Sequence, residues 1–473
     1  MEPIGLVERL GRWSSGRGAL YLLLAARIRT LIDEGELPPG TLLPPDRALA
    51  SALVVGRTTV VAAYDLLAGE GRIVRRQGSG TRVAGPASPA RPTTEAPGFL
   101  HLLEPRDGVI MLACAAPDAP PPELIEAYTG ILPGLAGLSG DLGYHPMGHL
   151  GLRRAIADRY AARGLPTGPD QILVTSGGQQ ALTLLARALI RPGDRVLVQA
   201  PTYFGALEVF REEAAVLRTL PVGLSGFAAA LATHRPALAY AMSAFHNPTG
   251  TVLPEPERRR LARAAADAGV PLIDDEVLAE LGFPGEPAPP PLAQYHDQVI
   301  TIGSLSKVIW GGLRVGWLRA PAPFIARLAR MRTVLDLGGD IPAQLAAAHL
   351  LPRLDRSLAR TARQRRERHD HLRAELDRHL PAWHVPAVPG GQTLWVRLPH
   401  GDGQSFAQRT LRHGVAVLPG SGLDAGGGSA DRLRLHFLAE PDQLTEAVRR
   451  LAAAWRDYGE RPNREAYPPA MAV

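Results

Sequence analysis

The sequence predicts a chain of two domains, in which a small helical module ending in a β-hairpin is followed by a large α/β domain. Three observations predict this organisation. Apolar residues recur at helical spacing between Leu24 and Leu67, a proline-rich stretch without hydrophobic periodicity follows, and short apolar strands then alternate with helical segments. With 473 residues and 45% hydrophobic side chains, the chain can bury more than one core.

The bulk composition excludes several classes of protein. A net charge of +6 and a pI near 9.7 permit a nucleic-acid partner without demanding one. Cys114 is the only cysteine, so we expect no intramolecular disulfide and no cysteine-based metal site, which fits a reducing cytoplasm. The N-terminus lacks the apolar segment of a signal peptide, and Ala19 to Ala26 is too short to span a bilayer. We therefore expect a cytoplasmic protein without a membrane partner.

Residues 15–83 predict three helices and a hairpin. The first helix ends at Pro38-Pro39-Gly40, the second follows Pro44-Pro45, and Val54-Val55-Gly56 turns into the third. The apolar positions are Leu24, Ile28, Leu31 and Ile32, then Leu49, Ala52 and Leu53, then Val60, Ala63, Tyr64 and Leu67. Two helices joined by a tight glycine-containing turn form a helix-turn-helix, and the two short strands of Ile73 to Val83 would be its wing.

Arg57, Thr58 and Thr59 begin the third helix, where a recognition helix presents its first residues to base edges in the major groove of double-stranded DNA. The other candidate DNA-binding residues are Arg47, Arg75 and Arg76, which suit phosphate contacts, and Gly78 and Ser79 in the wing. Each arginine alone is more often a solvated surface charge. The ordered series favours DNA binding.

Across this module the chain resembles the GntR family of winged-helix regulators. The matching motifs are Pro39-Gly40, Leu43-Pro44, Arg47, Leu49-Ala50, Arg57-Thr58-Thr59-Val60, Ala63-Tyr64, Leu67, Glu70-Gly71 and Gly78-Ser79-Gly80-Thr81. Two positions depart from the family pattern, since Pro45 and Gly56 stand where serines are usual. Proline suits a helix start and glycine is a tolerable cap, so we expect DNA binding to survive.

Residues 84–105 predict a linker, because Gly85 to Gly98 carries four prolines and no hydrophobic periodicity. The arginine-rich stretch Arg353 to Arg378 has the spacing of a long exposed helix, which we favour over a second nucleic-acid surface.

The large domain, residues 106–460, places polar groups after its apolar strands. The expected strands are Gln171 to Thr175, Arg195 to Gln199, Ala237 to Met242, Pro271 to Asp274 and Val299 to Gly303. Gly177 to Gln180 opens the helix that runs to Leu189, so its free N–H groups suit a phosphate. Tyr203 and Asn247 follow later strands, and Asp275 ends an apolar strand, where a partly buried carboxylate needs a cation.

Lys307 is the only lysine, and the other 51 basic residues are arginines. A chain that uses arginine wherever a positive charge suffices retains lysine where an amine must lose its proton and attack a carbonyl, as in a Schiff base. Codon bias is the competing explanation. Arg314, which can grip a phosphate bidentately, lies seven residues further on.

Together these residues resemble the fold-type I pyridoxal phosphate (PLP) enzymes of the class I/II aminotransferase group. The resemblance implies an internal aldimine at Lys307, with Asp275 on the pyridinium nitrogen and Asn247 on the ring hydroxyl. It further implies the following roles: Tyr203 stacks on the ring, Gly178, Gln179, Ser304 and Arg314 hold the phosphate, Tyr144 reaches it from a partner subunit, and Arg434 binds a substrate carboxylate.

Three features depart from that pattern or refine it. Val277 and Leu278 occupy the candidate positions of the tyrosine that usually bonds the ring hydroxyl, which would weaken transamination. Ala115 replaces a glycine near the substrate and would narrow the pocket. The spacing of Lys307 and Arg314 is similar to that of the regulator branch.

The chain joins a GntR-type DNA-binding module, a linker and an aminotransferase-like domain in that order. This order resembles the MocR/GabR family of PLP-dependent transcriptional regulators. That resemblance implies a homodimer with two DNA-binding modules. In it, PLP, or an amino-group effector bound through an aldimine, changes how the two modules bind paired half-sites of an operator. An active aminotransferase with an added DNA-binding module is the alternative, supported by Gly390 to Val396 and Arg434. A plain GntR repressor with an inert body is the third interpretation.

Overall fold

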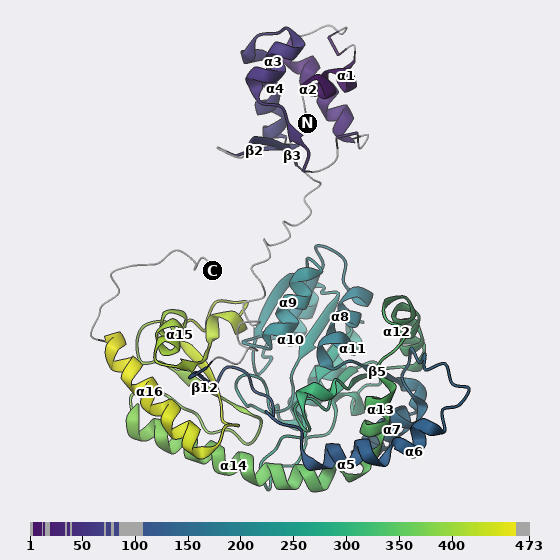
Figure 1. The fold of residues 1–473 in the computed structure, drawn as a ribbon, viewed down its shortest axis with the longest axis vertical. Coiled ribbons are helices and arrows are strands. Elements are labelled where there is room, and N and C mark those ends of the chain that lie inside the picture. Colours follow the sequence, from purple (N-terminus) through teal and green to yellow (C-terminus); the bar gives the residue numbers. More distant parts are fainter. Residues whose placement is uncertain are drawn as a thin grey trace. The chain divides into compact units, whose positions relative to one another are not determined.

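The computed structural model describes residues 3–11, 13–14, 19–33, 36–37, 40–70, 72–76, 80–84 and 107–459. The chain divides into two units, Met1–Glu95 and Ala96–Val473 (Figure 1). Each unit has its own hydrophobic core. The expected linker, residues 84–105, lies outside the described residues apart from Ala84.

The N-terminal unit contains the three helices and the hairpin that the sequence predicts. The elements are α1 (Pro3–Leu10), α2 (Leu20–Asp33), β1 (Leu42–Leu43), α3 (Asp46–Leu53), α4 (Arg57–Gly69), β2 (Ile73–Arg76) and β3 (Gly80–Val83). The strands form an antiparallel sheet in the order β1-β3-β2. Helix α1 and strand β1 were not predicted, because each is too short to show a periodic pattern.

The turn between α3 and α4 follows from local backbone chemistry. Val54 ends α3 in the left-handed region with φ of 55°, and Gly56 is the extended N-cap of α4 without a side-chain cap. The buried Tyr64 hydroxyl of α4 donates to the carbonyl of Pro44 at 3.1 Å, which ties α4 to the residues just before α3. The orientation of the two helices therefore rests on one buried polar contact as well as on apolar packing.

The large unit is built on a seven-stranded sheet in the order β5-β11-β10-β9-β8-β6-β7. The strands are β5 (Ile172–Thr175), β6 (Arg195–Ala200), β7 (Val216–Pro221), β8 (Leu238–Ala241), β9 (Leu272–Asp275), β10 (Ile300–Ser304) and β11 (Gly316–Arg319). Strand β11 is antiparallel to both of its neighbours, and the remaining pairs are parallel. All five predicted strands are present within one residue at each end.

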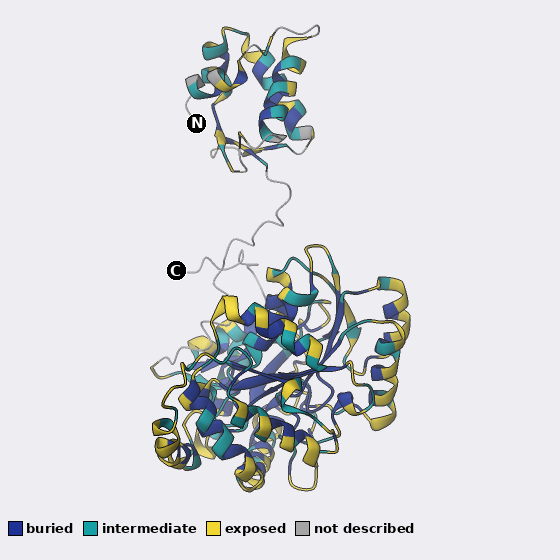
Figure 2. Cartoon of the chain, turned by 90° about the vertical axis from the view of Figure 1, so that its right-hand side faces the viewer, coloured by how far each residue is buried: buried dark blue, intermediate teal, exposed yellow. Residues whose placement is uncertain are grey.

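Helices cover both faces of this sheet. Successive residues of β6, Leu197 and Val198, lie in different core clusters, as the alternation of a strand requires. Figure 2 shows the buried sheet between helices with exposed outer faces. The helices are α5 (Pro122–Gly130), α6 (Leu132–Ala136), α7 (Leu150–Ala162), α8 (Gly178–Leu189), α9 (Phe204–Glu212), α10 (Phe227–His234), α11 (Glu255–Asp267), α12 (Ala322–Leu335) and α13 (Ile341–Leu350).

The C-terminal part of this unit forms a further core around a sheet in the order β12-β15-β14. Its elements are α14 (Leu354–His379), β12 (Thr393–Arg397), α15 (Gly403–Arg412), β13 (Val415–Ala416), β14 (Leu418–Pro419), β15 (Arg432–His436) and α16 (Pro441–Gly459). The early strand β4 (Ile110–Met111) pairs in parallel with β13, so residues from both ends of the unit share this part.

The long helix predicted from Arg353 to Arg378 is confirmed as α14, but the expectation that it is exposed is wrong for one face. Seven of its residues are buried: Leu354, Ala362, Arg365, His369, Leu372, Glu375 and Leu376. The sequence does not reveal this buried face, because a helix that packs against two hydrophobic cores also has charged side chains at some of its buried positions. Within the described part of the chain, no helix is long and apolar enough to cross a membrane.

Replacing Tyr64 by Phe should remove the bond to Pro44 and leave that buried carbonyl without a partner. We expect a loss of about 1 kcal/mol in the local stability of α4, which corresponds to about fivefold faster amide exchange. Hydrogen exchange followed by mass spectrometry on α4 peptides would measure it. Tyr21→Phe is the control, since Tyr21 is 37% exposed. Equal exchange in both variants would contradict a structural role for the Tyr64 hydroxyl.

Candidate functional site

Lys307 follows strand β10 and reaches the interior of the large unit. Its Nζ donates to the carbonyl of Ala115 at 2.6 Å. Burial lowers the pKa of Lys307 from 10.5 to about 8, and repulsion from Arg434 adds to the effect, although the attraction of Asp275 opposes it. A far larger share of this amine is therefore unprotonated near neutral pH than of an exposed lysine.

The amine lines a cavity of about 270 Å³, just below the range of about 300–1,000 Å³ that is usual for small-molecule pockets. The lining residues come from several elements that are far apart in the sequence: Ala113, Cys114, Ala115, Gln179, Tyr203, Phe204, Asn247, Leu278, Lys307, Gln392, Thr393 and Arg434. The structure thus brings Lys307, Asn247, Tyr203, Gln179 and Arg434 to one cavity.

Asp275, the last residue of β9, is a buried carboxylate held by two donors. The hydroxyl of Tyr240 on the neighbouring strand β8 donates to its Oδ2 at 2.6 Å, and the amide of Val277 donates to its Oδ1 at 3.1 Å. Burial nevertheless raises the pKa of Asp275 to about 6. A cation close to this carboxylate would lower that pKa again.

Arg434 lies on β15 and is buried in the cavity wall. Its Nη1 donates to Oδ1 of Asn247 at 3.1 Å, and its Nη2 donates to the carbonyl of Ala113. Burial lowers the pKa of Arg434 to about 10, so the group stays charged at neutral pH. Its Nε has no hydrogen-bond partner among the described residues. This buried cation therefore has capacity for an anionic ligand.

A second group of donors surrounds the start of α8. Gly177, the N-cap, has φ of 95°, and a Cβ added there would lie 2.7 Å from Nη2 of Arg314. Arg314 donates to the carbonyl of Ser176. Ser304, at the end of β10, bonds the hydroxyl of Ser306 at 3.0 Å. Free amides at a helix start, a guanidinium and hydroxyls form a cradle that suits a phosphate.

Tyr203 and Gln179 contact each other at the cavity wall. The Tyr203 hydroxyl donates to Oε1 of Gln179 at 3.0 Å, and Nε2 of Gln179 donates to the carbonyl of Gly205 at 3.0 Å. Burial raises the pKa of Tyr203 to about 12, so the phenol stays protonated. The pair fixes the aromatic ring beside the cavity.

The segment that follows the linker supplies acceptors for three buried side chains of the site, two of them basic. Three carbonyls of residues 111–115, which follow β4 and bend at Ala113, accept hydrogen bonds from side chains of the site. The pairs are Met111 O with His436 Nε2 at 2.5 Å, Ala113 O with Arg434 Nη2, and Ala115 O with Lys307 Nζ at 2.6 Å. Burial lowers the pKa of His436 to about 4, so its ring is neutral.

Of the two candidate positions for the missing tyrosine, Leu278 lines the cavity. Val277 instead lies against Gly178, at 3.3 Å from the position of a Cβ added there. Tyr144 is 65% exposed and does not line the cavity. The roles assigned to these residues stay predictions.

Sequence reasoning missed Tyr240 and Gln392. A tyrosine inside an apolar strand has the pattern of an ordinary core residue. The buried hydroxyl of Tyr240 nevertheless needs a hydrogen-bond partner, which is Asp275 at the end of the adjacent strand. Gln392 donates to the carbonyl of Lys307 at 3.1 Å across 85 residues of sequence. No local pattern marks such a contact.

The candidate DNA-binding residues of the N-terminal unit differ in their availability. Arg47, Arg57 and Thr58 are exposed, and Thr59 is half-buried. Arg75 bridges Asp46 at 2.8 Å and also pairs with Asp65. A phosphate contact by Arg75 would therefore compete with two carboxylates. The side chain of Arg76, and all of Gly78 and Ser79, lie outside the described residues.

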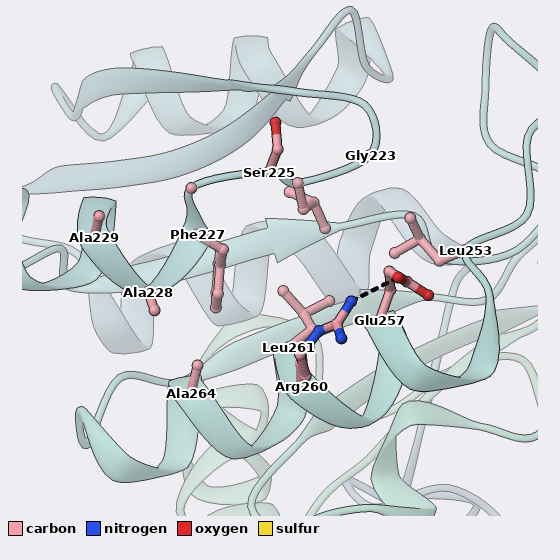
Figure 3. A pocket seen from close by; sticks show the side chains of 12 residues that line it. Gly223, Ser225, Phe227, Ala228, Ala229, Leu253, Glu257, Arg260, Leu261 and Ala264 are labelled. Carbon is pink, nitrogen blue, oxygen red and sulfur yellow. Dashed lines mark hydrogen bonds and ion pairs between the residues drawn. The ribbon is translucent and has the colours of Figure 1, made fainter.

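A third feature of the large unit is an apolar cavity of about 480 Å³ beside α10 and α11 (Figure 3). Phe227, Leu253 and Leu261 line it, and an ion pair of Arg260 and Glu257 at 2.6 Å lies at its edge. It contains no lysine and no unpaired buried carboxylate, so it does not suit the chemistry of the Lys307 cavity.

The fold and the site define a winged helix-turn-helix protein with an aminotransferase-like domain. The sequence family "Bacterial regulatory proteins, gntR family" matches residues 20–83, and "Aminotransferase class I and II" matches residues 116–451. The chain belongs to the MocR-type regulators, in which these two domains are joined in one polypeptide.

Three similar proteins illustrate the relationship. The HTH-type transcriptional regulator YisV of Bacillus subtilis is 30% identical, over 93% of this chain and 99% of its own length. The probable rhizopine catabolism regulatory protein MocR of Rhizobium meliloti is 30% identical, over 77% and 78%. The α-aminoadipate aminotransferase LysN of Thermus thermophilus, solved with N-(5'-phosphopyridoxyl)-L-leucine, has a TM-score of 0.69 and 30% identity over 76% of this chain and 95% of its own.

The lowered pKa of Lys307 predicts unusual reactivity of its amine. On cofactor-free protein, acetylation of Lys307 by acetic anhydride should rise with pH to a plateau, with its midpoint near 8, because only the unprotonated amine reacts. Peptide mass spectrometry would measure the rate. Arg366→Lys supplies an exposed reference lysine, whose midpoint should lie near its ordinary value of about 10.4. Equal midpoints would contradict the effect of burial.

Proposed function

We propose that this chain is a cytoplasmic, homodimeric transcriptional regulator that holds PLP at Lys307 and senses PLP or an amino-group ligand there. The observation that carries the proposal is the buried Lys307 amine, whose lowered pKa leaves it reactive between Arg434 and the cradle at the start of α8. A DNA-binding unit in the same chain gives such a site a regulatory output.

The residues present fit PLP. The cradle of Gly178, Gln179, Ser304 and Arg314 supplies donors for a phosphate, and a Cβ at Gly177 would fill part of it. Asp275, whose pKa burial raises, suits a protonated ring nitrogen. Bound PLP supplies an aldehyde carbon that an amino group can attack.

The remaining groups of the cavity would orient the ring and the ligand. Asn247 suits the ring hydroxyl, and Tyr203 suits the ring face. Arg434 suits a ligand carboxylate, because its Nε is unpartnered and its other contacts are to neutral groups. Leu278 contributes no hydrogen bond where a catalytic tyrosine is usual, so we favour sensing over turnover.

On the N-terminal unit, exposed Arg57 and Thr58 at the start of α4, together with Thr59, would reach base edges in the major groove. Arg47 at the start of α3 would contact a phosphate. An effector changes this binding only if it has different affinities for two conformations of the protein. The effect must then be reciprocal, so operator DNA would change the affinity for the effector.

Gly177→Ala should weaken PLP binding. The added Cβ approaches Arg314 in a backbone conformation that alanine rarely adopts, so the cradle must shift. We expect about a tenfold higher Kd, because a cost of about 1.4 kcal/mol gives that factor. Spectrophotometric titration of dialysed protein would measure it, with Lys307→Ala as the baseline. Gly193→Ala is the matched control, since its φ is 89° with no atom near the added Cβ. Equal losses of PLP affinity in Gly177→Ala and Gly193→Ala would show that backbone strain, and not the contact with Arg314, causes the effect.

Binding of double-stranded DNA selected from a random pool by the wild-type protein tests the regulatory output. Arg57→Gln should weaken binding about tenfold, because a lost base contact costs about 1–3 kcal/mol. Arg29→Gln should change it little, because Arg29 lies on α2 and pairs with Glu70, at the end of α4 opposite to Arg57. Titrations with and without PLP and a panel of amines should differ. Identical affinity and identical DNA bending under all conditions would refute effector sensing.

A further inference from the structure

One face of α14 is polar where it passes beneath the Lys307 site. Residues spaced 3, 4, 7, 8 and 11 positions from the first share a face of a helix. On this face they are Ser357, Arg360, Thr361, Gln364, Arg365 and Arg368. Helix α14 runs along both parts of the large unit, beside α5 and α16 (Figure 1).

This face lines a cavity of about 740 Å³, distinct from the cavity of about 270 Å³ described above. Its other walls come from residues 109–122 and from the end of β15. Lys307, Gln392 and Cys114 line both cavities, so a ligand in the larger one would lie against the wall of the cofactor site. Its volume is in the range of small-molecule sites.

Arg365 is a buried cation of this cavity without an acidic partner among the described residues. It is 6% exposed, and its Nη1 and Nη2 donate only to neutral oxygens, Thr361 Oγ1 at 3.0 Å and the carbonyl of Gly282 at 3.3 Å. Its Nε has no partner. Burial lowers its pKa to about 10, so it remains charged at neutral pH. A buried charge without a counter-ion is costly, which favours an anionic ligand.

The other arginines of this face have acidic partners outside the cavity lining. Arg360 pairs with Glu123, and Arg368 pairs with Glu440. Among the described lining residues, Asp118 alone carries a carboxylate, and the ring of His436 is neutral. The lining is therefore positive overall.

Gln392 adds an unsatisfied acceptor at the shared wall. It is 3% exposed, and its Oε1 has no hydrogen-bond partner although its Nε2 donates to the carbonyl of Lys307. A donor group on a ligand would satisfy this oxygen.

We propose that this cavity is a second ligand pocket, in which Arg365 binds the carboxylate or phosphate group of a small metabolite. The ligand differs from one held by Arg434, because the two guanidiniums lie in different cavities that meet at Lys307 and Gln392. A ligand in this cavity contacts Lys307 and Gln392, which also line the cofactor cavity. The protein would thus respond to a second small molecule through the same residues. The proposal does not depend on PLP being bound.

Isothermal titration of the full-length protein with succinate and, separately, with inorganic phosphate tests the proposal. The two probes distinguish a carboxylate from a phosphate ligand. Wild-type protein should bind at least one of them with a Kd below about 1 mM, a modest affinity for a single charged site. Arg365→Gln should abolish binding in this cavity, whereas phosphate held by the cradle at the start of α8 would persist in that variant and would not count as support. Gln364→Glu, which places a carboxylate beside Arg365 without removing a buried group, should weaken it at least about tenfold.

Two controls assign the site. Arg366→Gln removes the same charge from the exposed side of α14 and should leave binding unchanged. Arg434→Gln should also leave it unchanged. Loss of binding in Arg434→Gln, or full binding in Gln364→Glu, would overturn the proposal, as would the absence of binding to wild type by both anions. If Arg365→Gln does not fold, Gln364→Glu decides the outcome alone.

Discussion

The removal of one lysine amine from water is the constraint around which the large unit is arranged. The amine of Lys307 is held by a carbonyl, that of Ala115, rather than by a carboxylate. An ion pair would retain the proton, whereas a neutral acceptor and burial together release it. Asp275 acts on the amine through its charge, and each of its oxygens, which accept from Tyr240 and Val277, can accept a further bond.

Uncompensated positive charge is the second theme of this unit. Arg314, Arg434 and Arg365 donate to carbonyls or to neutral side chains and have no acidic partner in the described structure. Arg163 shows the opposite arrangement, since it pairs with the buried Glu276 at 3.1 Å. The fold therefore builds a buried ion pair at Arg163 but none at the buried Arg434 and Arg365, whereas Arg314 is exposed. Anionic ligands would supply the negative charges that these arginines lack within the protein.

Sequence reasoning located Lys307 because a single lysine among arginines is visible without a structure. It located Asp275 because strand ends are readable from apolar runs. It could not find the bond from Tyr240, because a strand tyrosine has the same signature whether its hydroxyl meets solvent or a carboxylate. It also misjudged Arg365, since helical spacing does not say which face of an arginine-rich helix turns inward. Contacts across the fold depend on packing, and packing is not local in sequence.

Residues 111–115 connect three side chains of the Lys307 site to one stretch of backbone. Its carbonyls accept hydrogen bonds from His436, Arg434 and Lys307, and it is anchored to β13 through β4. A displacement of this segment would change all three hydrogen bonds together. One of these bonds is to the Lys307 amine, so a shift of the segment would also change the basicity of that amine.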